Sequence, residues 1–157
     1  MKNNLHDSSR IWIYQSNVEF TDEQCAVINE ALREFLTTWN YHGTDLSSAA
    51  EIVNKRFVVF VVDERIQGAG GCSIDKSVAL VKAFEKEFDV ELMNRMNIAY
   101  LNEGDVVIKK MMDFQSSIKS GEVNEDTIVF NNLVQTKGEF LSSWQVPLKD
   151  SWHKQLL

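Results

Sequence analysis

The segment Phe57–Val62 (FVVFVV) constrains the fold of this chain more than any other feature of the sequence. Every residue in it is apolar, so a strand at this position has to be covered on both of its faces. The dipeptide Asn54-Lys55 precedes it and predicts a tight hairpin to a strand at 48–53, because Asn tolerates a left-handed backbone. We therefore predict that Arg56–Asp63 forms a central strand of a sheet.

Strand and helix signals alternate before and after this strand. The stretch RIWIYQS at 10–16 alternates in side-chain type and is rich in β-formers, which predicts a strand. Thr21 and Gln24 have the spacing of a capping box, and apolar residues at helical spacing follow, so we predict a helix at about 22–39. A second helix is predicted at about 74–88 from its own apolar stripe.

The order of these elements suggests a fold class. We predict further strands at 97–101, 106–108 and 127–130, and a helix at 111–120 that ends at Gly121. The order through residue 101 is then β-α-β-β-α-β, the ferredoxin-like pattern. We predict an α/β (α+β) fold with a ferredoxin-like core, a predominantly antiparallel sheet and a C-terminal α/β extension.

The length of 157 residues favours one domain, so we predict a single domain over 1–157. Residues 1–9 are polar and are interpreted as a mobile tail. The pattern over 131–157 is weak, but Val146–His153 is flanked by Trp144 and contains Leu148 and Trp152. Such a segment is too apolar for a solvated end, so we predict that it packs on the domain.

The formal net charge of −7 bears on partners, because it disfavours binding to phosphate backbones and to anionic membrane surfaces. We therefore expect neither nucleic acid nor membrane as a partner. The polar start of the chain does not resemble a secretory signal, and two cysteines do not form a disulfide framework. A reducing cytoplasm is the predicted location.

The segment Gly70–Ser77 (GGCSIDKS) has the spacing of a phosphate-binding loop with one departure. Asp75 stands where the consensus has its second glycine, and a carboxylate there would repel phosphate. The run Val58–Asp63 resembles a Walker B strand but precedes the loop, whereas it normally follows. We predict that the chain does not hydrolyse ATP.

A plainer interpretation makes the same segment an anion site. Glycines lead into a helix whose N-terminal amides and dipole favour anions, and we take Gly70, Gly71, Ser73, Asp75, Lys76 and Ser77 as candidate ligand-binding residues. The structural alternative is a glycine-rich turn followed by a cap, with Ser73 as N-cap and Asp75 complementing the dipole. Capping alone accounts for those two residues, so this alternative is favoured.

Cys72 is the candidate nucleophile, because a thiol at a helix N-terminus can have a lowered pKa. A catalytic thiol needs a base, and the candidates are His42 and His153, both remote in sequence. The alternative is a cysteine that serves as a small packing residue. The spacing of His, Cys and acidic residues indicates no metal site, and no cofactor is predicted.

Four stretches carry a family resemblance: RIWIYQS (10–16), GCSIDKS (71–77), VFNNLVQTK (129–137) and KDSWH (149–153). With them the chain resembles a small bacterial family of about this length that is often labelled "ABC transporter ATPase". The resemblance covers nearly the whole chain. It implies a small protein of this size but no particular activity.

Two functional classes follow from these residues. The first is a small binding module that holds an anionic or phosphorylated ligand at 70–77, or a protein partner. The alternative is a thiol-dependent enzyme that uses Cys72. The sequence identifies neither the ligand, nor the partner, nor the oligomeric state.

Overall fold

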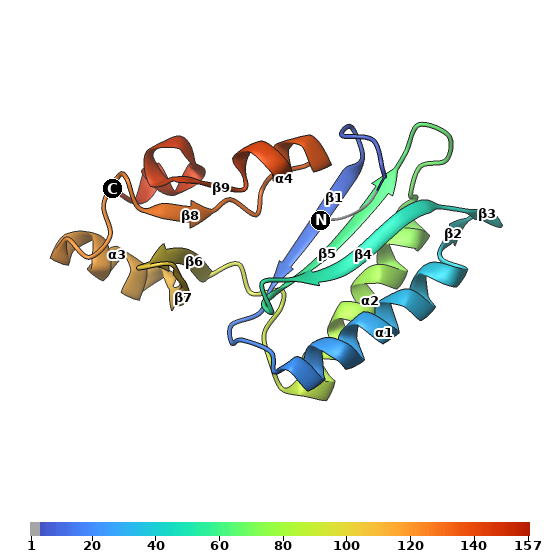
Figure 1. The fold of residues 1–157 in the computed structure, drawn as a ribbon, viewed down its shortest axis with the longest axis horizontal. Coiled ribbons are helices and arrows are strands. Elements are labelled where there is room, and N and C mark those ends of the chain that lie inside the picture. The colour runs from blue at the N-terminus through green and yellow to red at the C-terminus, as the bar shows by residue number, and fades with distance from the viewer. Residues whose placement is uncertain (1–3) are drawn as a thin grey trace. The chain divides into compact units, whose positions relative to one another are not determined.

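A computed structural model describes residues 4–157 of the chain (Figure 1). The chain divides into two compact units. As far as it is described, the first unit comprises residues 4–93 and 135–138, and the second comprises 94–134 and 139–157. Helices and antiparallel strands occur in both, which confirms the α+β class.

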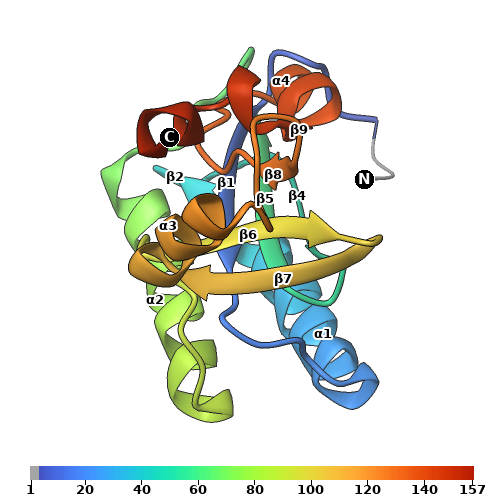
Figure 2. The ribbon, with the colours of Figure 1, turned by 90° about the vertical axis from the view of Figure 1, so that its left-hand side faces the viewer.

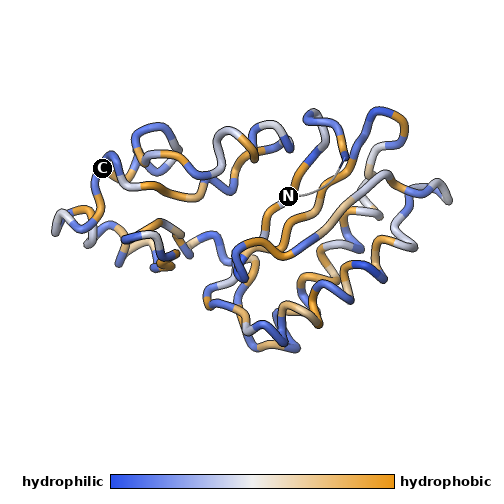
Figure 3. Tube along the Cα trace, viewed as in Figure 1, coloured by the Kyte–Doolittle hydropathy of each residue, from blue (hydrophilic) through white to orange (hydrophobic). Residues whose placement is uncertain are grey.

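The sheet of the first unit is built around the apolar strand. It contains β1 (Arg10–Gln15), β4 (Ser47–Val53) and β5 (Phe57–Asp63) in the order β1-β5-β4, with antiparallel pairing throughout. All of β5 is buried, and β5 is the middle strand, as its two apolar faces predict. Its trace is mainly apolar in Figure 3, whereas the helices alternate between polar and apolar residues.

Two helices cover one face of this sheet (Figure 1). They are α1 (Asp22–Thr38) and α2 (Gly71–Phe88). The predicted capping box is confirmed, since Thr21 Oγ1 accepts a hydrogen bond from the Gln24 amide at 3.1 Å and Gln24 Oε1 accepts one from the Thr21 amide at 3.0 Å. The core of this unit is a cluster of buried apolar side chains from both helices and the sheet: Phe20, Ile28, Leu32, Trp39, Leu46, Val58, Phe60, Val62, Val81, Phe84 and Leu92.

Short turns connect the elements of the first unit. Between β4 and β5, Asn54 and Lys55 both have positive φ, at 52° and 54°, which confirms the predicted left-handed hairpin turn. After α1 the chain forms a small hairpin of β2 (Asn40–Tyr41) and β3 (Thr44–Asp45), a pair that the sequence analysis does not predict. This hairpin packs at the start of α2, which matters for the candidate site.

The ferredoxin-like core is the part of the fold prediction that is not confirmed. Strands β1, β4 and β5 have the order that this pattern requires, but the expected fourth strand, β6 (Asn97–Asn102), pairs with β7 and β8 in another sheet. The other edge of β1 instead lies beside the segment 135–138, and Arg10 forms an isolated β-bridge with Thr136. Local hairpin pairing of β6 with the strand that follows it accounts for the difference.

The second unit contains a sheet in the order β7-β6-β8-β9, again antiparallel. The β6–β7 hairpin, yellow in Figure 2, turns at Glu103 and Gly104, which both have positive φ. Helix α3 follows directly and ends at Gly121, in the left-handed conformation predicted for a helix stop. The remaining elements are β7 (Asp105–Lys110), α3 (Met111–Ser120), β8 (Ile128–Phe130), α4 (Lys137–Ser143), β9 (Gln145–Pro147) and the 3₁₀ turns Leu148–Asp150 and Trp152–Leu156.

The C-terminal segment packs into the second unit, as predicted. Leu148 is fully buried in an apolar cluster with Ile98, Tyr100, Phe114 and others, and Trp152 packs against the same cluster. The backbone of the C-terminal segment is also hydrogen-bonded, because the Leu148 amide donates to the Thr127 carbonyl at 2.8 Å. Residues 146–153 are therefore part of the core of this unit.

The start of the chain differs from the predicted mobile tail. Residues 1–3 of that tail lie outside the described residues, but the following ones are bonded to the segment 135–138. Lys137 Nζ donates to the Leu5 carbonyl at 2.7 Å, and the Gly138 amide donates to the Asp7 carbonyl at 2.8 Å. Ser9 is completely buried. The polar composition of residues 1–9 suggested a solvated end, but long-range hydrogen bonds connect residues 5–9 to the segment 135–138.

Candidate functional site

The glycines before α2 are required by close packing. A Cβ on Gly70 would lie 2.1 Å from Cε2 of Tyr41, and one on Gly68 would lie 2.9 Å from Oε2 of Glu64. Neither glycine has a positive φ. These glycines therefore allow a close approach by groups of the protein itself, mainly the ring of Tyr41 on the β2–β3 hairpin.

The two candidate serines of this segment face inward. Ser73 was predicted as the N-cap of α2, and this is wrong: the N-cap is Gly70, and Ser73 lies buried in the first turn. Its hydroxyl donates to the Asn40 carbonyl at 2.6 Å, and its own carbonyl accepts from Trp39 Nε1 at 2.9 Å. Ser77 is also buried and donates to the Ile74 carbonyl at 2.6 Å. Both hydroxyl protons are thus used within the fold.

The other candidates share the exposed face of α2. Gly71, Cys72, Asp75 and Lys76 are exposed, and nothing lies within 4 Å of a Cβ built on Gly71. No side chain caps this helix, and its first turn contains no acidic residue. Asp75 lies beyond that turn, so the capping alternative does not account for these residues either.

The candidate catalytic residues are not brought together as a thiol and its base. Cys72 is exposed, and no hydrogen bond joins it to His42 within the described residues. The ring of His42 lies instead against Tyr41, with centroids 4.1 Å apart. His153 belongs to the other unit and is 1% exposed, with Nδ1 2.7 Å from Ser151 Oγ. Burial lowers the pKa of His153 to about 4.

The packing of Gly70 leads to a prediction with an internal control. We expect Gly70→Ala to lower the free energy of unfolding by about 1–3 kcal/mol, because the new methyl group would overlap the ring of Tyr41. Gly71→Ala places the same methyl group in open space at a helical position, so we expect no loss and a gain of up to about 1 kcal/mol. Urea denaturation of both variants measures the difference. Equal stability of the two would contradict the packing explanation.

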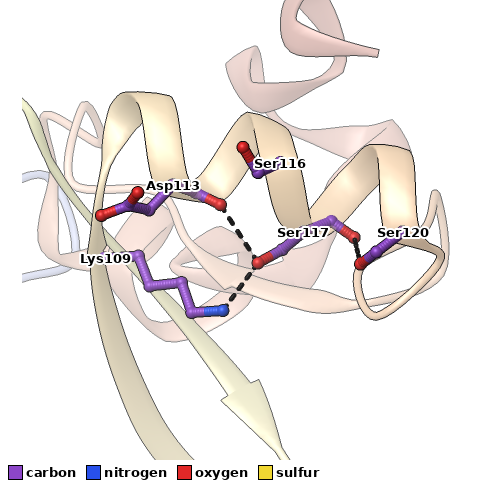
Figure 4. Close-up of a pocket in the computed structure, with 5 residues that line it drawn as sticks. All are labelled: Lys109, Asp113, Ser116, Ser117 and Ser120. Atoms are coloured by element: carbon purple, nitrogen blue, oxygen red, sulfur yellow. Dashed lines mark hydrogen bonds between the residues drawn. The ribbon is translucent and has the colours of Figure 1, made fainter.

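A second candidate site lies in the second unit, between β7 and α3. Lys109, Asp113, Ser116, Ser117 and Ser120 line a pocket of about 410 Å³, which we call the serine pocket (Figure 4). Four of these residues follow one another at helical spacing along α3, so their side chains share one stripe of the helix. Lys109 lies near the end of strand β7, and its side chain extends along this stripe.

A charged network forms one wall of the serine pocket. Lys109 Nζ donates to Ser117 Oγ at 2.7 Å and to Glu122 Oε2 at 2.9 Å. The hydroxyl of Tyr100 donates to the other carboxylate oxygen of Glu122 at 3.3 Å. The Glu122 carboxylate raises the pKa of Lys109, and the Lys109 ammonium lowers the pKa of Glu122. Both side chains are therefore charged at neutral pH.

The proximity of Lys109 to Ser117 resembles a nucleophile beside a base, but the protonation states do not suit that chemistry. A lysine base must be neutral to take a proton from serine, whereas the raised pKa keeps Lys109 protonated. The Ser117 hydroxyl donates its proton to the Asp113 carbonyl at 3.1 Å. The hydrogen bond between Lys109 and Ser117 therefore fixes the positions of the two side chains and is not suited to acyl transfer.

The serine pocket is not predicted from the sequence, although the helix that forms it is. The available signal was the spacing of Asp113, Ser116, Ser117 and Ser120, which places small polar side chains along one face of α3. What the sequence could not indicate is that Lys109 faces this stripe, because that depends on how β7 lies against α3.

Within the described residues, no group of three or more His, Cys, Asp and Glu side chains is placed to hold a metal ion. The Asp63 carboxylate accepts hydrogen bonds from the Arg65 guanidinium at 2.7 to 3.1 Å, and this contact lowers the pKa of Asp63 to about 2. Across residues 4–157, no helix has the length and apolarity needed to cross a bilayer.

Comparison with protein-family models, with curated proteins and with solved structures found no match to this chain. The resemblance of the four stretches to the family labelled "ABC transporter ATPase" therefore stays a prediction.

Proposed function

We propose that this chain is a binding protein and not an enzyme, and that it holds a small polar ligand in the serine pocket. The observation that carries the proposal is the pocket itself, which has about 410 Å³ of space and is lined by three serines, Lys109 and Asp113. Small-molecule sites in proteins begin at about 300 Å³. A set of hydroxyl, carboxylate and ammonium groups that share one concave surface suits recognition by hydrogen bonds.

The absence of a suitable base near a nucleophile supports binding over catalysis within the described residues. Ser117 lies beside a lysine that is protonated, and Cys72 has no hydrogen bond to a histidine. The thiol-enzyme alternative therefore has less support than the binding module. We also place the protein in the cytoplasm, which suits its two free cysteines.

Anion binding at the first turn of α2 stays a prediction. Its support is the exposed face of Gly71, Cys72 and Lys76 next to uncapped amides. It has less support than the serine pocket, because Ser73 and Ser77 face the core and the Glu64 carboxylate already accepts from the Ala69 amide at 3.0 Å.

One NMR experiment tests both sites. The ¹⁵N-labelled protein is titrated separately with 1,4-diaminobutane, 1,4-butanediol, glucose and inorganic phosphate at constant ionic strength. We expect at least one probe to cause saturable shifts of the amides of residues 109–120. Shifts of the amides of 71–76 with phosphate would support the anion prediction at α2.

A pair of variants controls for binding elsewhere on the surface. Ser116→Phe fills the serine pocket from an exposed helical position, and Gln115→Phe places the same ring on α3 outside the lining. We expect the first variant to lose the saturable shifts and the second to keep them. If no probe binds at 109–120, or if the two variants behave alike, the proposed function is wrong.

A further inference from the structure

The hydroxyl groups of the serine pocket have already donated their protons. Ser116 donates to the Met112 carbonyl at 3.2 Å, Ser117 to the Asp113 carbonyl at 3.1 Å, and Ser120 to the Ser117 carbonyl at 3.0 Å. A hydroxyl has one proton and two acceptor lone pairs. None of these serines therefore has a proton left for a ligand. As acceptors they differ, because Ser117 is buried and already accepts from Lys109, Ser120 accepts from the Glu122 amide at 3.4 Å, and Ser116 is exposed.

The one cation of the lining is already paired. The charge of Lys109 faces the Glu122 carboxylate, and a second N–H of its ammonium points to Ser117. The ammonium also lies 5.9 Å from the ring centre of Tyr100. An anionic ligand would have to compete with Glu122 for this ammonium, so the pocket is poorly suited to anions.

Asp113 is the charged group of the lining that remains open to a ligand. Its side chain is exposed, and Figure 4 shows its carboxylate apart from the bonds that join Lys109, Ser117 and Ser120. The charge of Lys109 is offset by Glu122, which lies outside the lining, so the Asp113 carboxylate is the lining charge that a ligand meets. The open hydrogen-bonding groups of the lining are acceptors.

From this arrangement we infer that the ligand of the serine pocket is a small organic cation with N–H donors, a primary amine in its ammonium form. The inference rests on the proposed function, since it names the ligand class for the same site. The ammonium would pair with Asp113 and donate to the hydroxyl of Ser116, and a second N–H donor would reach the remaining lone pair of Ser120. Acceptors from Asp113 to Ser120 extend over about 10 Å of helix, which suits an elongated amine with a donor at each end.

The test uses two probes that have the same carbon chain length but differ in charge. 1,4-Diaminobutane carries two ammonium groups, whereas 1,4-butanediol carries two neutral hydroxyl groups. Each is titrated into the full-length ¹⁵N-labelled protein while the amides of 109–120 are followed. We expect the diamine to bind at least several-fold more tightly than the diol, and its affinity to fall as NaCl is raised.

Two charge-removing variants separate a specific site from general attraction to an acidic protein. Asp113→Asn removes the lining carboxylate, and we expect it to weaken diamine binding by about fivefold, the upper range for an exposed ion pair. Asp105→Asn removes the same charge from an exposed position on β7 outside the lining, and we expect it to leave the affinity unchanged. Spectra of the free variants show whether each keeps its fold.

The outcomes distinguish this inference from the proposed function. If the diol, glucose or phosphate binds at 109–120 as tightly as the diamine, or if both aspartate variants weaken it equally, the cation inference is overturned while the site stands. If no probe binds there, both fail.

Discussion

Removal of residues 146–157 is expected to unfold the second unit or to lower its stability severely. Leu148 is fully buried, and replacing such a leucine by alanine alone typically costs about 2–5 kcal/mol. The deletion also removes most of β9, which pairs with β8, and Trp152, which packs on the same apolar cluster. Since small domains are stable by only about 5–15 kcal/mol, this loss is a large fraction of the total.

Thermal unfolding followed by circular dichroism measures this effect. The control is a chain that ends at Leu156, because it loses only Leu157, whose side chain is 61% exposed. We expect the control to melt at the temperature of the intact protein. A similar melting temperature for the chain that ends at Gln145 would show that the C-terminal packing contributes little.

The second large effect is expected from acid, through His153. Burial lowers its pKa in the folded protein from 6.5 to about 4, so the folded state prefers the neutral ring. Between these two values the unfolded chain binds a proton that the folded chain does not bind. Stability is therefore unaffected above about pH 6.5 and falls as the pH decreases towards 4, by up to about 3 kcal/mol in total.

Urea denaturation at a series of pH values between 7 and 4 tests this dependence. The variant His153→Phe keeps a ring beside Trp152 and Phe114 but cannot titrate, so we expect a smaller slope of stability against pH whatever its absolute stability. An equal slope in the variant and the intact protein between pH 6.5 and 5 would show that His153 is not the group responsible.

Much of the fold followed from local patterns in the sequence. The two apolar faces of Phe57–Val62 predicted the central strand, and Asn54-Lys55 predicted the turn before it. The pair Thr21 and Gln24 predicted the start of α1. These features depend on neighbours along the chain, so a single sequence contains the information needed to predict them.

The predictions that failed depend on contacts distant in sequence. The ferredoxin-like order required β6 to lie beside β1, but periodicity reports that a strand exists and not which strand it pairs with. Ser73 has the composition of an N-cap, yet Trp39 and Asn40 bind it from the preceding hairpin. The single domain over 1–157 stays a prediction, and no glycine or proline lies at 93–94, where one compact unit gives way to the other.

The candidate site was predicted less well than the fold. The glycines before α2 were predicted to lead into a helix, but the sequence could not show that the ring of Tyr41 packs against Gly70. The serine pocket was not predicted, since its shape depends on Lys109 extending from β7 along α3. Side chains from two elements define a pocket, whereas spacing along one element defines only a stripe.

The return of the chain at 135–138 has a consequence for how the protein is made. Residues 135–138 form hydrogen bonds with Leu5, Asp7 and Ile11. These hydrogen bonds of the first unit can form only after more than forty further residues have been synthesised beyond Met93. During synthesis the edge of β1 stays without that partner, and a strand with a free edge is prone to pair with other chains. A recombinant fragment that stops at Met93 would have the same open edge, and aggregation of such a fragment would reflect the missing return segment.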